Sequence, residues 1–197
     1  MSSREMILEA VRRNQPTASP LPEVPLFDQG QPPAWQRFRD SLERMGGKLA
    51  EPGTGGDLGA LVKELHPGAQ VICSATPEVE GNRPLGDVRA PKDLDDVDVG
   101  VVRAVFGVAE TGSVFLGETE LGVPALGYLA QHLVVLLDPA DVVDNLHNAY
   151  HRPEFQNASY AVLMTGPSAT ADIEGVLIHG AQGVRSLTVV AAPRSQA

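Results

Sequence analysis

Apolar residues follow two patterns that alternate along the chain. Continuous apolar runs bounded by turn residues are typical of buried strands, and they fall at residues 70–74, 99–108, 113–116, 133–137, 160–164 and 187–191. Apolar stripes at three- and four-residue spacing are typical of helices, and they fall at residues 33–45, 57–65, 139–149 and 168–178. Strands that alternate with helices predict an α/β domain with a largely parallel sheet.

The first 34 residues have a different pattern. Ser2 and Glu5 have the spacing of a capping box at the start of a short amphipathic helix. Six prolines between Pro16 and Pro33 then predict an extended arm, because proline removes an N–H donor and fixes φ. We therefore divide the chain into an N-terminal helix with its arm, residues 1–34, and an α/β domain, residues 35–197. We expect the helix to pack on its own domain; the alternative is a detachable lid or partner-binding arm.

Composition excludes several classes of partner. The chain has 197 residues, 25 acidic against 15 basic side chains, and only 5% aromatics. A net charge of −10 repels phosphate backbones, which argues against nucleic acid and anionic membrane surfaces. No apolar run approaches the roughly 18 residues of a membrane helix. Since the first residues also lack the apolar core of a signal peptide, we expect a cytoplasmic protein.

Metal and cluster sites find little support in the sequence. Cys73 is the single cysteine, so this chain cannot hold an iron–sulfur cluster by itself. The acidic residues between Asp93 and Asp98 lack the pattern of a calcium loop, and His147 and His151 lack a third ligand. We expect no metal ion and no cofactor bound by the chain alone.

The C-terminal segment from Met164 to Glu174 is the first candidate site. We expect a strand, a glycine turn and then a helix, whose N-terminus can hold an anion with Gly166, Ser168 and Thr170. The structural alternative is that Ser168 or Thr170 caps the helix and that Asp172 complements its dipole.

Glu110, followed by Thr111 and Gly112, is the second candidate. The flanking strands predict a hairpin or a sharp reversal. Such a carboxylate is either a nucleophile or base in a cleft, or an exposed acid on a turn. No Lys or Arg occurs between Arg103 and Arg152, so an anionic ligand needs its positive partner elsewhere, such as Arg83, Arg89, Arg103 or Arg185.

Two segments, GVAETGS at residues 107–113 and TGPSATADIE at residues 165–174, resemble the signature blocks of the LUD-domain family. This is the lactate-utilization protein C group, formerly a domain of unknown function, and the resemblance runs from about Leu42 to the C-terminus. Asp98 and His132 also resemble family positions. Ala169 and Gln182 depart from the family, which often has arginine and histidine there.

The resemblance implies a three-layer α/β sandwich similar to the sugar-phosphate isomerase and CoA-transferase fold. It implies an accessory role in the oxidation of L-lactate to pyruvate, beside iron–sulfur and FAD-binding partner proteins, with a small anionic ligand. Two alternatives stay open: an isomerase or acyl/CoA-transferase-like enzyme that uses Glu110, and a scaffold that binds no ligand.

Both candidate turns follow strands, and parallel sheets bind ligands at the carboxyl ends of their strands. We therefore predict one shared pocket, lined by Glu110, Thr111, Gly112, Gly166, Ser168, Thr170 and Asp172, with His132 nearby.

Overall fold

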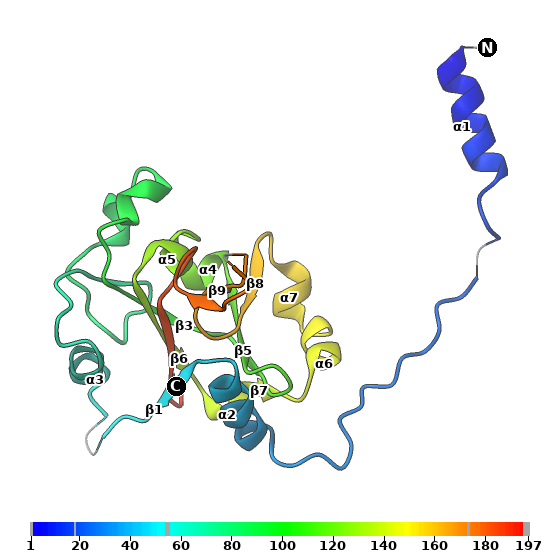
Figure 1. Cartoon of the computed structure of the whole chain (residues 1–197). Helices are drawn as coiled ribbons and strands as arrows, with labels where there is room; N and C mark the ends of the chain where they lie inside the picture. Colours follow the sequence, from blue (N-terminus) through cyan, green and yellow to red (C-terminus); the bar gives the residue numbers. More distant parts are fainter. Residues whose placement is uncertain (1, 18, 54–55, 173, 195–197) are drawn as a thin grey trace.

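Five parallel strands form the central sheet of the computed structural model, which describes residues 2–17, 19–53, 56–172 and 174–194 (Figure 1). The strands lie in the order β1-β11-β6-β3-β2. Their bounds are Lys48–Ala50 for β1, Ile72–Ser74 for β2, Val99–Arg103 for β3, His132–Leu137 for β6 and Ser186–Ala191 for β11. The predicted α/β class with a largely parallel sheet is confirmed.

A second sheet of four short strands packs beside the first, in the order β7-β4-β5-β8. Its bounds are Gly107–Val108 for β4, Ser113–Gly117 for β5, Val142–Val143 for β7 and Ala161–Met164 for β8. β4 and β5 are antiparallel neighbours, so the predicted hairpin around Thr111 and Gly112 is confirmed.

All helices except the first lie beside the two sheets (Figure 1). The α-helices are α1 Ser3–Arg13, α2 Ala34–Arg44, α3 Leu58–Leu65, α4 Glu118–Leu121, α5 Leu126–Leu129, α6 Leu146–Tyr150 and α7 Pro153–Asn157. The 3-10 turns are η1 Leu85–Asp87, η2 Pro91–Leu94 and η3 Pro139–Asp141.

The side chains of β3 point alternately to the two faces of the parallel sheet and pack against a different layer on each face. Val99 and Val101 pack against the apolar side chains of α3 on one face. Val102 points to the opposite face, where it joins Phe38 of α2 and Val114 of β5 in a second core. A third, smaller core around Phe106 and Phe115 lies between the second sheet and the helices α6 and α7.

The predicted helix over residues 139–149 is wrong in its first half. Pro139 opens only a 3-10 turn, and Val142 and Val143 then pair in parallel with β4 as strand β7. The helix begins at Leu146, where the side chain of Asn145 accepts a hydrogen bond from the backbone of Asn148. Valine is β-branched and favours strands, and both valines are half-buried beside β4 in the sheet.

The predicted helix over residues 168–178 is also wrong. The segment forms a two-stranded antiparallel ribbon of β9 Ala169–Thr170 and β10 Ile178–His179. Glu174 and Gly175 both have positive φ, which reverses the chain and breaks a helix. Ile173, part of the predicted stripe, lies outside the described residues.

The expectation that the first helix packs on its own domain is wrong as well. The capping box between Ser2 and Glu5 is present, but no residue of α1 is buried, and the helix stands away from the domain at the end of its arm (Figure 1). The arm reaches the domain near Phe27, whose ring meets His147 with centroids 5.6 Å apart, and at Asp28, which accepts a hydrogen bond from Asn148.

Neither a spanning helix nor a metal cluster emerges from residues 2–17, 19–53, 56–172 and 174–194. No helix there is long and apolar enough to cross a membrane. No group of three or more His, Cys, Asp or Glu side chains there is placed to hold a metal ion.

Candidate functional site

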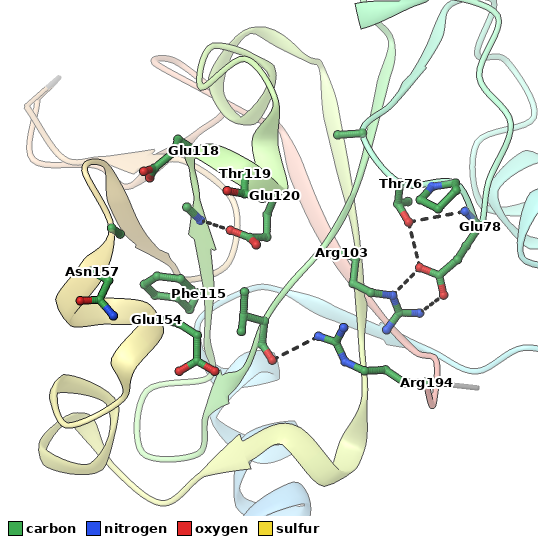
Figure 2. Close-up of a pocket in the computed structure, with 15 residues that line it drawn as sticks. Thr76, Glu78, Arg103, Phe115, Glu118, Thr119, Glu120, Glu154, Asn157 and Arg194 are labelled. Carbon is green, nitrogen blue, oxygen red and sulfur yellow. Dashed lines mark hydrogen bonds and ion pairs between the residues drawn. The ribbon is translucent and has the colours of Figure 1, made fainter. Parts of the chain in front are cut away.

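A cavity of about 620 Å³ lies at the carboxyl edge of the parallel sheet (Figure 2). Ala75 directly follows β2, Arg103 is the last residue of β3, and Arg194 follows β11. Open α/β sheets bind ligands at this edge, because loops there diverge from the strand ends. We call this space the carboxyl-edge cavity.

Arg103 is held firmly in one wall. Its guanidinium forms a bidentate ion pair with the carboxylate of Glu78 and donates a hydrogen bond to the carbonyl of Ala192 at 3.0 Å. The hydroxyl of Thr76 donates to the same carboxylate at 2.8 Å. Burial of Glu78 opposes ionisation, but the hydrogen bonds from Arg103 and Thr76 outweigh it, so the pKa of Glu78 lies below its ordinary value.

Arg194 lies on the same side of the cavity (Figure 2). Its Nε pairs with Asp141 at 3.0 Å, and its Nη2 donates to the carbonyl of Ala104 at 3.2 Å. Nη1 makes no hydrogen bond within the described residues.

The opposite wall carries polar groups from the second sheet and its helices. Figure 2 shows Glu118, Glu154 and Asn157 there. Both carboxylate oxygens of Glu118 accept backbone N–H groups, from Ser159 at 2.9 Å and Tyr160 at 3.0 Å, and these bonds lower the pKa of Glu118.

The nearby Glu120 accepts from the backbone of Gly117 at 2.9 Å, and Glu154 pairs with Arg152 at 2.8 Å. The side chains of Thr119 and Asn157 make no hydrogen bond within the described part of the chain. This wall therefore offers two neutral polar side chains to a ligand, beside three carboxylates that are already hydrogen-bonded or paired.

Of these residues, only Arg103 is expected from the sequence as a source of positive charge. The sequence does hold a signal for the others: Thr76 follows the apolar run at 70–74, and Arg194 follows the run at 187–191. Glu118 and Glu120 follow β5 in the same way.

The predicted residues Glu110 and Thr111 line a different cavity, of about 400 Å³, beside α2 and α6. The exposed Glu110 carboxylate accepts the backbone N–H of Leu146, the first residue of α6, at 3.1 Å. It therefore caps a helix.

The two glycines of the predicted site serve the packing of α2. Gly112 and Gly166 both have positive φ, and both touch the end of this helix: a Cβ on Gly112 would lie 2.3 Å from the backbone nitrogen of Leu42, and one on Gly166 would lie 2.3 Å from the carbonyl oxygen of Met45. Neither position has room for a side chain.

The remaining predicted residues lie elsewhere. Ser168 is bound through its backbone to Val184 and Gly180, while Thr170 accepts from the backbone of the exposed Asp172 at 3.3 Å. His132 lines a third cavity, at the amino edge of the parallel sheet. The residues of the predicted shared pocket are therefore found in separate places. Glu110 and Thr111 line the cavity beside α2 together with Thr165, whereas His132 lies at the amino edge of the parallel sheet.

Comparisons with known proteins place the chain in a family. The LUD domain matches residues 87–191. A crystal structure of a DUF162 family protein from Deinococcus radiodurans superposes with a TM-score of 0.60 at 16% identity, covering 80% of this chain and 95% of that one, and so supports the α/β fold.

An uncharacterized protein of Neisseria meningitidis serogroup B is 30% identical over 99 residues, which are 49% of this chain and 42% of the relative. The chain thus matches less than half the length of that protein. The LUD match covers more than half of the 197 residues, including Arg103 and the wall from Gly117 to Asn157. The chain therefore belongs to the LUD domain family.

Proposed function

We propose that this chain is an accessory protein of L-lactate utilization, acting beside iron–sulfur and FAD-binding proteins that carry out the oxidation to pyruvate. The observation that carries the proposal is the LUD match, because the matched segment builds most of the carboxyl-edge cavity. LUD domains are associated with lactate utilization.

The cavity supplies groups that suit a small 2-hydroxy or 2-keto acid. Nη1 of Arg194 is a charged donor for a carboxylate, and arginine binds carboxylates with strong, directional hydrogen bonds. The Thr119 hydroxyl and the Asn157 amide can bind the hydroxyl or keto oxygen. Glu78 and Asp141 neutralise much of the charge of the two arginines. Glu118, Glu120 and Glu154 line the same cavity, so we expect weak binding of an anion.

Binding of L-lactate, D-lactate and pyruvate is measured by calorimetry on the full chain. We expect saturable binding of L-lactate or pyruvate, weakened about tenfold in Arg194→Gln, which corresponds to one charge-assisted hydrogen bond. Arg39→Gln, an exposed arginine on α2, is the matched control and is expected to bind like the wild type. If none of the three acids binds, the proposal that the cavity holds a 2-hydroxy or 2-keto acid is contradicted, and a scaffold role is favoured.

The accessory role is tested in cells. Deletion of the gene is expected to slow growth on L-lactate, and a tagged chain is expected to co-purify with iron–sulfur and FAD-binding proteins. Unchanged growth, with no second copy of the gene present, would contradict the role.

A further inference from the structure

Two histidines face each other in a cavity of about 360 Å³ at the amino edge of the parallel sheet. His66 follows α3, and His132 is the first residue of β6. Asp98 precedes β3 and Arg185 precedes β11, and both line the same space. We call it the amino-edge cavity; it lies at the end of the sheet opposite the carboxyl-edge cavity.

The imidazole rings of His66 and His132 are stacked, with centroids 4.6 Å apart and an interplanar angle of 27°. Nδ1 of His132 is within hydrogen-bond distance of the Ser186 hydroxyl, at 2.8 Å, which fixes this ring. Nε2 of His66 is buried and has no hydrogen-bond partner among the described residues. A buried polar atom of this kind is costly unless something binds it.

The surrounding charge is positive, although the whole chain carries −10. Lys48 and Arg185 act on the histidine pair from β1 and from the turn before β11. Arg185 forms no ion pair within the described part of the chain. Asp98 is the opposing carboxylate, and its Oδ2 already accepts the backbone N–H groups of Gln70 and Val71 at 2.8 and 2.9 Å.

We propose that the amino-edge cavity binds a phosphate-class dianion, either inorganic phosphate or a phosphate monoester, between Arg185 and the His66–His132 pair. The arginine fork and two imidazole N–H groups match the several terminal oxygens of a phosphate. A metal ion fits less well, because the cavity supplies two imidazoles and one carboxylate whose Oδ2 is already engaged. This site is independent of the function proposed above.

Proton uptake is the signature of such a site. Burial lowers the pKa of both histidines. The pKa of His66 is lowered further by His132 and then by Lys48, and that of His132 by Arg185 and Lys48. Asp98 raises the pKa of His132, but this effect is smaller. The pair is therefore neutral at neutral pH, and a bound dianion would raise the pKa of each ring and draw in a proton.

Nuclear magnetic resonance of the five histidines tests the proposal directly, with inorganic phosphate and glycerol 3-phosphate as probes. We expect the ring signals of His66 and His132 to shift together and saturably, while those of His147, His151 and His179 stay in place.

Calorimetry at about pH 7.5 in two buffers of different ionisation enthalpy is expected to show net proton uptake. Tighter binding of glycerol 3-phosphate than of phosphate would identify an ester as the source of the dianion, and the reverse order would identify the free ion.

Three variants separate binding from folding. Arg185→Gln and His66→Asn are each expected to weaken phosphate binding about tenfold or more, as expected for the loss of a charged partner. In His132→Asn the amide can still meet the Ser186 hydroxyl while Nε2 is lost, so the fold is kept and binding is weakened. Arg39→Gln and His151→Gln are the matched controls and are expected to bind phosphate normally.

The proposal is overturned if phosphate and its ester do not bind, or if Arg185→Gln binds them normally. It is also overturned if sulfate binds equally well and no proton is taken up, because the site would then be a general anion site. Loss of L-lactate binding in the tests above would leave these results untouched, so the two proposals fail separately.

Discussion

The hydroxyl groups of Ser113 and Thr165 are hydrogen-bonded to each other, although 52 residues separate them. The hydroxyl of Thr111 extends this chain, with its oxygen 2.7 Å from that of Ser113. The two segments that carry the family resemblance therefore do meet, but they meet at the end of α2, where their glycines press against its backbone. Their geometry supports the packing of this helix on the second sheet.

Gly112→Ala is expected to destabilise the protein by about 2 kcal/mol or more. The new methyl group would meet the backbone of Leu42, which cannot rotate away, and φ at this position is +68°. Urea unfolding measures the change. Gly86→Ala is the matched control, because a Cβ there has nothing within 4 Å; if both variants unfold alike, the close approach to α2 does not matter for stability.

Glu110→Ala is expected to destabilise the protein by about 1 kcal/mol through loss of the cap on α6. Glu110→Gln keeps an acceptor oxygen and is expected to recover most of this loss. Thermal unfolding of the three proteins measures the effect. A covalent adduct on Glu110 after incubation with acyl-CoA donors, seen by intact mass, would instead show the enzymatic alternative.

Much of the fold could be predicted from the sequence because its signals are local. The run from Val99 to Val102 has the continuous apolar character of a strand covered on both faces, and β3 is buried on both. Asp57, at the start of the helical stripe over residues 57–65, accepts the N–H of Ala60 at 2.9 Å and caps the helix. Both features, the strand and the helix cap, depend on residues that are only a few positions apart in the sequence.

The wrongly predicted elements are those whose secondary structure depends on contacts with residues far away in the sequence. Val142 and Val143 have helical spacing with Leu146, but pairing with β4 makes them a strand. Apolar residues after Ser168 also have helical spacing, yet Val176 and Leu177 are exposed in the structure. The grouping of His132 with the two turns overlooked a local signal: His132 comes directly before the apolar run at 133–137 and begins β6, whereas Arg103 ends β3.

Removal of residues 2–20 is expected to change the free energy of unfolding by less than about 0.5 kcal/mol, because α1 buries nothing. Removal of residues 2–28 is expected to cost about 1–2 kcal/mol, because it also deletes the contacts of Phe27 with His147 and of Asp28 with Asn148. Urea unfolding distinguishes the two. A large loss in the shorter truncation would show that α1 packs on the domain in solution.

Acid is expected to weaken the wall of the carboxyl-edge cavity through Glu78. Its pKa in the folded protein lies below the ordinary glutamate value because of Arg103 and Thr76, despite the opposing effect of burial. A depressed carboxylate pKa stabilises the fold above the ordinary value, and this stability is lost as the pH falls through the lower, folded-state pKa. The window for this contribution therefore begins near pH 4.5, the ordinary value, and extends downward.

Arg103→Gln is expected to lower the free energy of unfolding by about 2 kcal/mol at neutral pH, since it breaks charge-assisted hydrogen bonds to Glu78. Below pH 4.5 the difference from the wild type is expected to shrink, because the protonated Glu78 no longer pairs with Arg103. Urea unfolding at a series of pH values between neutral and about pH 3 checks both statements. Arg39→Gln serves again as the control, since it should stay parallel to the wild type throughout. A difference between Arg103→Gln and the wild type that stays constant with pH would show that Arg103 acts by packing alone, without the ion pair.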